Sequence, residues 1–219
     1  MALKNRKKIE INTGNLITDH HPESLISEQF KAIRTNIQFS PKGEGCKTLL
    51  ITSPDNSEEK LTTTAVNLAI SIVQDKKKVL LIDANIKQPS LHSLFYLSNE
   101  LGLTDVLLGK CDLEQAIHQT EIARLEVMTS GQIPFISTEL FGLKSWKTIM
   151  ETKLTPYDKI IINAPSILNN TDTKLLANQC DGVILILSPG KTKLEKAIDA
   201  KKILSFAHAN VVGTILNHQ

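Results

Sequence analysis

Residues 48–69 read TLLITSPDNSEEKLTTTAVNLA, and they join a strand pattern to a helix pattern through a short loop. Thr48–Thr52 has the length and β-branched content of a buried strand, and residues 62–74 have helical spacing. A strand, a loop ending in a lysine (Lys60) and then a helix is the layout of a phosphate-binding loop. The glycines of such a loop are absent, however, and three acidic residues lie in or beside it: Asp55, Glu58 and Glu59. The stretch therefore predicts a strand–loop–helix unit and leaves nucleotide binding open.

The rest of the chain repeats this alternation of strand and helix. Further strand patterns lie at 78–83, 125–129, 159–163, 182–188 and 210–216, and further helical patterns at 24–39, 113–118, 138–151, 172–178 and 193–207. Several strands are apolar throughout, as expected where helices cover both faces of a parallel sheet. We predict a doubly wound, mostly parallel α/β domain over residues 23–219, preceded by a flexible basic arm over residues 1–22.

Composition excludes several classes of protein. The 219 residues are 41% hydrophobic and 22% charged, with a formal net charge of +2, which is too small to favour nucleic acid as a partner. Three scattered cysteines without a CxxC pair indicate a reducing compartment and no structural zinc. No apolar run reaches the roughly 20 residues that a membrane span needs. The basic residues of the arm (Lys4, Arg6, Lys7 and Lys8) fit a solvated tail or weak contact with an anionic surface.

Three segments end central strands and should converge at one edge of the sheet, where ligands of such folds bind. They are the loop at 53–60, KVLLIDANIKQPSLHSLF at 78–95 and YDKIIINAPS at 157–166. SEQFKAIRTNI precedes them at 27–37, and DGVILILSPGKT at 181–192 and GTILN at 213–217 follow.

In order and spacing, these segments resemble the bacterial tyrosine kinases of capsule and exopolysaccharide systems. That family consists of P-loop proteins related to the MinD and ParA ATPases. The resemblance covers nearly the whole chain and implies a P-loop NTPase-like fold, ring-forming homo-oligomers, and ATP or ADP with Mg²⁺ as cofactors. It also implies a cytoplasmic protein held at the inner face of the membrane by an adaptor, the polysaccharide co-polymerase of the same pathway.

The resemblance assigns a subunit contact to the first long helix. The family's motif Glu-x-x-Arg-x-x-Arg matches Glu28, Lys31 and Arg34, with lysine in place of the middle arginine. Spacing of three places these residues on one helix face, where they could form ion pairs across an interface or remain a solvated face.

For nucleotide binding, the resemblance assigns Lys60 to the P-loop lysine and Asn217 to a contact with the purine. Ser57 and Glu59 replace the loop glycines, and Leu61 stands where a hydroxyl should bind magnesium. Thr62, with Thr63 beside it, takes that role only if one residue is looped out. The loop glycines and the magnesium-binding hydroxyl are thus missing, and we expect nucleotide binding to be weak or absent.

The catalytic carboxylates are also depleted. The family has Asp-x-Asp-x-Arg after one strand and Asp-Thr-Pro-Pro after another; this chain retains Asp83 but has Asn85 and Asn163 at the other two acidic positions. An amide carries no charge to attract magnesium or to accept a proton. No histidine or cysteine spacing indicates a metal site. The chain ends in His218 and Gln219 without the family's tyrosine cluster, and its tyrosines are Tyr96 and Tyr157.

Three functional hypotheses follow. A catalytically degenerate kinase-like protein could act as a regulatory or scaffold partner in polysaccharide export, joined to the adaptor or to a tyrosine kinase paralogue. An active ATP-dependent tyrosine kinase with a rearranged loop is the alternative. A partition ATPase is disfavoured, because Asp55 stands where such proteins carry an extra lysine.

Overall fold

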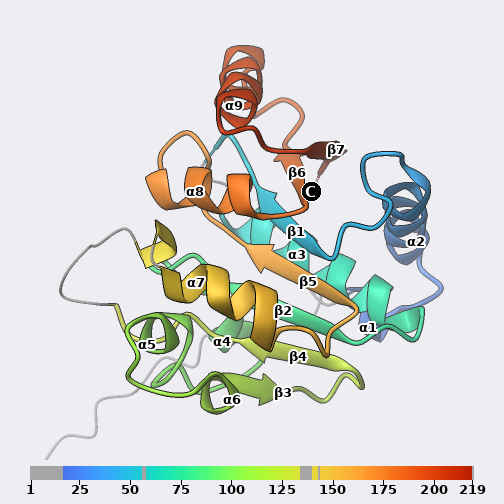
Figure 1. Ribbon diagram of the computed structural model, residues 1–219. Coiled ribbons are helices and arrows are strands. Elements are labelled where there is room, and N and C mark those ends of the chain that lie inside the picture. The colour runs from blue at the N-terminus through green and yellow to red at the C-terminus, as the bar shows by residue number, and fades with distance from the viewer. Residues whose placement is uncertain (1–16, 56–57, 134–139, 143, 219) are drawn as a thin grey trace, which may run out of the picture.

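A seven-stranded sheet forms the centre of the molecule (Figure 1). The structure is a computed structural model that describes residues 17–55, 58–133, 140–142 and 144–218. The strand order is β3-β4-β2-β5-β1-β6-β7, and every neighbouring pair is parallel except β3–β4. The strands are β1 (Thr48–Thr52), β2 (Val79–Asp83), β3 (Ile117–Gln119), β4 (Leu125–Met128), β5 (Lys159–Asn163), β6 (Gly182–Leu187) and β7 (Val211–Leu216). The predicted doubly wound α/β class is confirmed.

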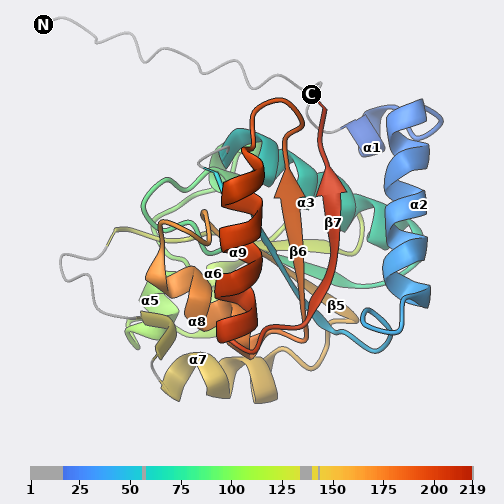
Figure 2. The same ribbon diagram turned by 90° about the horizontal axis from the view of Figure 1, so that it is seen from above.

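Helices cover both faces of this sheet (Figures 1 and 2). Successive residues of β1 show why: Leu49 and Ile51 pack beneath α2 and α3, whereas Leu50 packs in the core beneath α7, α8 and α9. The helices are α1 (Ile17–His20), α2 (Leu25–Phe39), α3 (Glu58–Gln74), α4 (Leu91–Leu94), α5 (Leu103–Leu107), α6 (Leu113–Ala116), α7 (Lys144–Thr148), α8 (Thr171–Gln179) and α9 (Leu194–Phe206). A 3₁₀ turn at Leu140–Gly142 and a π-helical turn at Ile149–Lys153 flank α7.

Three predicted helices differ from the structure by more than one residue at an end. The helix predicted at 113–118 ends at Ala116, and the next three residues form β3, an antiparallel edge strand that the sequence pattern missed. The helix predicted at 138–151 lies partly outside the described residues and otherwise corresponds to α7 and the π turn. Helix α3 begins at Glu58, four residues before the predicted start at Thr62, and this changes the site described below.

The predicted flexible arm also ends earlier than residue 22. Helix α1 packs on α3, where the backbone N–H and the hydroxyl of Thr18 both donate to Asn67 Oδ1, at 3.0 and 2.9 Å. Thr18 is fully buried, so a short polar segment is fixed because its hydrogen bonds are satisfied inside the protein. The basic residues of the arm lie outside the described residues. No described helix is both long and apolar enough to cross a membrane.

Candidate functional site

A buried polar cluster joins the carboxyl ends of β2 and β5 to the first turns of α3. The amide Nδ2 of Asn163 donates to Thr62 Oγ1 at 3.1 Å and lies 3.4 Å from Asp83 Oδ1. The Thr62 hydroxyl is also 3.0 Å from the Ser90 hydroxyl. The side chains of Asp83, Asn163 and Thr62 are buried. The fold therefore brings together three of the residues that the sequence singled out.

Asp83 is the carboxylate of this cluster, and its own chain satisfies it. Its Oδ2 accepts from the backbone N–H groups of Ser90 and Leu91 at 2.9 and 3.0 Å, and its Oδ1 accepts from the N–H of Asn85 at 3.2 Å. Burial raises the pKa of Asp83 to about 6, although these hydrogen bonds and the Asn163 amide act in the opposite direction. The Asp83 carboxylate thus holds the start of α4 in place by accepting two of its backbone hydrogen bonds.

The two amides at acidic positions have separate surroundings. Asn163 turns its donor group toward Asp83, and its buried Oδ1 has no hydrogen-bond partner in the described part of the chain. Asn85 Oδ1 accepts from the N–H of Gln88 at 3.3 Å, which closes the turn after β2. At position 163 an aspartate would put a second negative charge beside Asp83.

Lys60 and Thr62 leave α3 in different directions. The helix is continuous from Glu58, and the Thr64 hydroxyl donates to the Lys60 carbonyl at 2.7 Å, as expected four residues along an unbroken helix. Lys60 and Thr62 are two residues apart on the helix, so their side chains leave it roughly 200° apart around the axis. Thr62 therefore reaches the Asp83 cluster without a looped-out residue, whereas Lys60 leaves on the face of Thr63 and Thr64. The residue next to Thr62, Leu61, is buried in the apolar core.

The loop before α3 is tied to α9. Asp55 accepts from Lys196 Nζ at 2.9 Å, with 14% of the Asp55 side chain exposed. Burial alone would raise the pKa of Asp55, but hydrogen bonds from Thr192 and Lys196 hold it below its usual value. Asp55, one of the three acidic residues in or beside the loop, is therefore already paired with a cation of its own chain. Ser57 lies outside the described residues, as does the side chain of Glu58.

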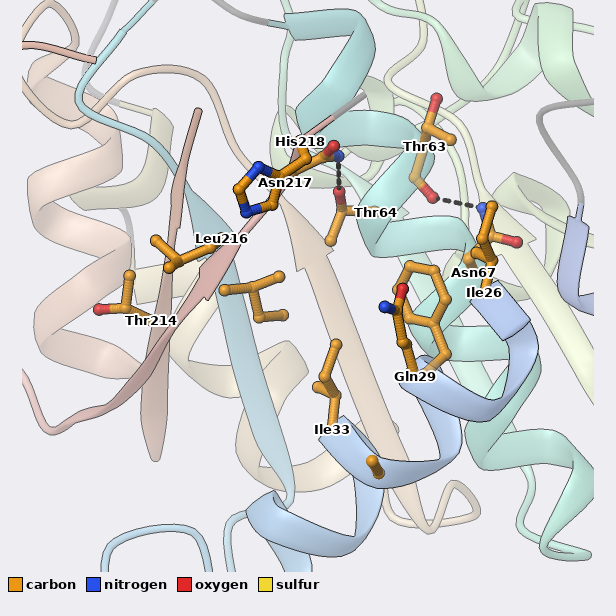
Figure 3. Close-up of a pocket in the computed structure, with 13 residues that line it drawn as sticks. Ile26, Gln29, Ile33, Thr63, Thr64, Asn67, Thr214, Leu216, Asn217 and His218 are labelled. Carbon is orange, nitrogen blue, oxygen red and sulfur yellow. Dashed lines mark hydrogen bonds between the residues drawn. The ribbon is translucent and has the colours of Figure 1, made fainter. Parts of the chain in front are cut away.

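A cavity of about 400 Å³ lies beside α3, between α2 and β7 (Figure 3). Thr63 and Asn217 line it, and Asn217 Nδ2 donates to Thr64 Oγ1 at 3.0 Å at one end. The opposite wall is apolar and includes Phe30 and Ile33 of α2. Of the four nucleotide-binding candidates, Thr63 and Asn217 thus line a cavity, while Thr62 belongs to the buried cluster.

The three residues predicted to form a subunit contact differ in their surroundings. Glu28 and Lys31 form an exposed ion pair of 2.6 Å within α2. Arg34 turns instead toward its own chain and donates from Nη1 to the carbonyl of Ser71, near the end of α3. A carbonyl in that region lacks a complete set of helical partners, so Arg34 caps α3 in this structure.

Ser90 and Thr64 are site residues that the sequence did not single out. A serine just before a short apolar helix is a recognisable helix-start signal, and Ser90 does precede α4. No pattern within the sequence indicated that its hydroxyl would meet Thr62, because the two residues come from different elements.

The residues of the buried cluster do not fit the magnesium-bound triphosphate that the family resemblance implies. Magnesium takes oxygen ligands in near-octahedral geometry, usually one or two carboxylates together with phosphates and waters, and here the one carboxylate is occupied by an amide donor and three backbone N–H groups. No group of three or more His, Cys, Asp or Glu residues within the described ranges could hold a metal ion.

Comparisons with known proteins agree with one another. Residues 60–202 match a family model described as an AAA domain. The chain is 41% identical over 217 residues to the tyrosine-protein kinase YwqD of Bacillus subtilis (strain 168), covering 99% of this chain and 91% of that protein.

Solved structures give the same result. The chimerical protein CapA2B2 has a TM-score of 0.88 at 30% identity, covering 94% of this chain and 90% of that one. The kinase domain of the Escherichia coli tyrosine kinase ETK has a TM-score of 0.87 at 28% identity, with 92% and 79% covered. MinD of Pyrococcus horikoshii, solved with Mg-ADP, shares the fold at 23% identity and a TM-score of 0.65, with 78% and 70% covered.

Proposed function

This chain belongs to the family of bacterial tyrosine-protein kinases, within the P-loop superfamily of MinD and ParA, and from that membership we propose that it is a catalytically degenerate member. Its role is that of a regulatory or scaffold partner in capsular or exopolysaccharide biosynthesis and export. The relatives carry the kinase activity in their names; the loss of that activity is our inference from the site.

The observation that carries the proposal is the direction in which Lys60 and Thr62 leave helix α3. A P-loop needs its lysine and its hydroxyl on consecutive residues, so that both reach the same phosphates. Here only Thr62 points to the Asp83 cluster, and Lys60 leaves the helix roughly 200° away. Asn163 and Asn85 stand where the family has carboxylates. Positioning and charge neutralisation, the two contributions on which phosphoryl transfer depends, are both weakened.

The partners follow from the family. We propose that the chain docks on a membrane adaptor of the same pathway, at the inner face of the membrane, and joins homo-oligomers or mixed rings with an active paralogue. The similarity to the CapA2B2 chimera supports the adaptor. For oligomerisation through α2, Glu28 and Lys31 are exposed, whereas Arg34 would have to leave the Ser71 carbonyl or act by shaping α2.

Turnover and nucleotide binding are tested on the same protein. Purified protein with ATP, Mg²⁺ and an added tyrosine-rich peptide should give no phosphotyrosine and no ADP above the buffer rate. A ligand at 100 times its dissociation constant stabilises a protein by about 2.7 kcal/mol, so a thermal shift with and without Mg²⁺ detects binding separately from turnover. We expect no magnesium-dependent shift.

An active kinase with a rearranged loop is the second candidate, and one observation favours it. The pKa of Asp83 is raised to about 6 by burial, close to the working pH, which suits a general base. Family-like phosphorylation of the peptide that disappears in Thr62→Val and Lys60→Ala, with normal folding of both variants, would establish this candidate and reject degeneracy.

A further inference from the structure

Strand β7 is an edge of the sheet with hollows on both of its faces. Within the described residues it pairs with β6 and has no strand on its other side. Three cavities adjoin it: those of about 400 and 220 Å³ lie toward α2, and one of about 520 Å³ lies toward α9. Thr214 lines all three. Figure 3 shows Thr214 and Leu216 on β7 and Ile33 across from them on α2.

In the part of the chain that the structure describes, no strand pairs with the outer edge of β7. The N–H of Asn217 donates to the Leu187 carbonyl of β6 at 2.9 Å, and the register from Gly213 to Leu216 is regular. Because backbone groups alternate in direction along a strand, those of Thr214 and Leu216 point away from β6. Both residues are exposed, so this edge is a template for another strand.

The cavity walls indicate which side chains a new strand would carry. On the α2 side the walls around Gly213 include the apolar side chains of Ile37 and Ile215, and a Cβ built at Gly213 would meet nothing within 4 Å. On the α9 side the walls include Lys42 and Lys201. The residues that line the three cavities include no aspartate or glutamate.

We infer that β7 binds an extended segment of another protein by strand addition, with apolar side chains in the α2 groove and acidic side chains toward Lys42 and Lys201. A second copy of this chain fits less well. Two β7 edges would bring like-charged lysines together, and Val211–Leu216 supplies no acidic residue. The inference does not depend on whether the Asp83 cluster turns over ATP, and the two are tested by different readouts.

The test uses a fluorescent synthetic peptide of about eight residues in which Ile and Glu alternate, which matches the six residues of β7 with one more at each end. Binding to the whole 219-residue chain is followed by fluorescence anisotropy. A peptide with Lys in place of Glu is the charge control. We expect the Glu peptide to bind at least about tenfold more tightly than the Lys peptide, because opposite charges meet.

Two variants block the edge while leaving the rest of the domain in place. Gly213→Val places a branched side chain in the α2 groove, where an added Cβ meets no atom within 4 Å, and Thr214→Pro removes an outward N–H from an edge position where proline is tolerated. Each should weaken binding of the Glu peptide at least about tenfold, with unchanged circular dichroism. Lys201→Glu should weaken it too, whereas Lys202→Glu, a neighbouring lysine of the Asp199 pair, should leave it unchanged.

Three results would overturn the inference. The Glu peptide could fail to bind the wild-type protein, or it could bind Gly213→Val and Thr214→Pro as tightly as the wild type. Sedimentation could also show a dimer that Gly213→Val dissociates, in which case the occupant of β7 is a second copy and not a partner segment.

Discussion

Replacing Asn163 with aspartate tests the electrostatic account of the buried cluster. Asn163 is 0% exposed, and its amide lies 3.4 Å from Asp83 Oδ1. Two carboxylates at that distance repel by about 5 kcal/mol at an effective dielectric constant near 20. The protein can avoid this by binding a proton, and protonating an ordinary carboxyl at pH 7 costs about 4 kcal/mol. The Asn163→Asp variant should therefore lose about 4 kcal/mol of unfolding free energy at pH 7.

The loss of unfolding free energy in Asn163→Asp should depend on pH in a definite direction. The new carboxyl has a folded-state pKa above its unfolded value, so the loss grows as pH rises from the unfolded pKa and shrinks as pH falls. By the same arithmetic the loss at pH 5 is about 1.5 kcal/mol. Urea denaturation of wild type and Asn163→Asp at both pH values measures the two differences.

Asn170→Asp is the matched control. Asn170 caps α8 by accepting from the N–H groups of Asp172 and Thr173, at 2.9 and 3.4 Å. A carboxylate keeps these acceptors at a helix N-terminus, so the change should stay within about 0.5 kcal/mol. An Asn163→Asp protein as stable as wild type at pH 7, or one with equal losses at both pH values, would refute the reasoning.

Three further predictions concern stability. Burial raises the pKa of Asp83 to about 6, so its contribution to the unfolding free energy should fall by about 3 kcal/mol as pH rises from about 4 to 6. Denaturation of the wild type across that window should show this decline, and Asp83→Asn should not. Lys196→Ala should cost about 1 kcal/mol because Asp55 loses its cation and keeps only the Thr192 hydrogen bond. A double-mutant cycle with Asp55→Ala should give a coupling that weakens in high salt, and additive losses would show that the contact is ineffective. Arg34→Ala should cost about 2 kcal/mol in thermal or urea unfolding because the Ser71 carbonyl loses a charged donor, whereas Lys31→Ala should cost less than about 0.5 kcal/mol; equal losses would contradict the capping role of Arg34.

The fold could be predicted from local sequence patterns, because strand and helix periodicities are properties of neighbouring residues. The boundaries of β1 and β5 were predicted to the residue, since apolar and β-branched runs between polar breaks leave little choice. Strand β3 was missed because it is three residues long and pairs antiparallel at the edge, where its pattern cannot be told from the end of a helix. The flexible arm stays a prediction for residues 1–16.

The candidate site could be predicted only in part from the sequence. Strand ends at one edge of the sheet indicated which segments would converge, and the family resemblance singled out Asp83, Asn85 and Asn163 within them. The sequence did not show that Asp83 would be saturated by backbone donors, because these come from the turn into α4 and depend on how that turn folds back. Nor did it show Arg34 bonded to α3, since the spacing of α2 gives a helix face but not what lies against it.

The composition and order of residues by themselves determined an α/β sheet, a family resemblance that the comparisons confirmed, and the absence of two carboxylates. Tertiary structure alone decided the directions of side chains. Because α3 starts at Glu58, Thr62 faces Asp83. Helical geometry puts Lys60 roughly 200° around the axis from Thr62, since each residue turns a side chain by about 100°. Packing also left β7 as an edge of the sheet among the described residues, which no local pattern can show, because an edge exists only once the other strands are in place.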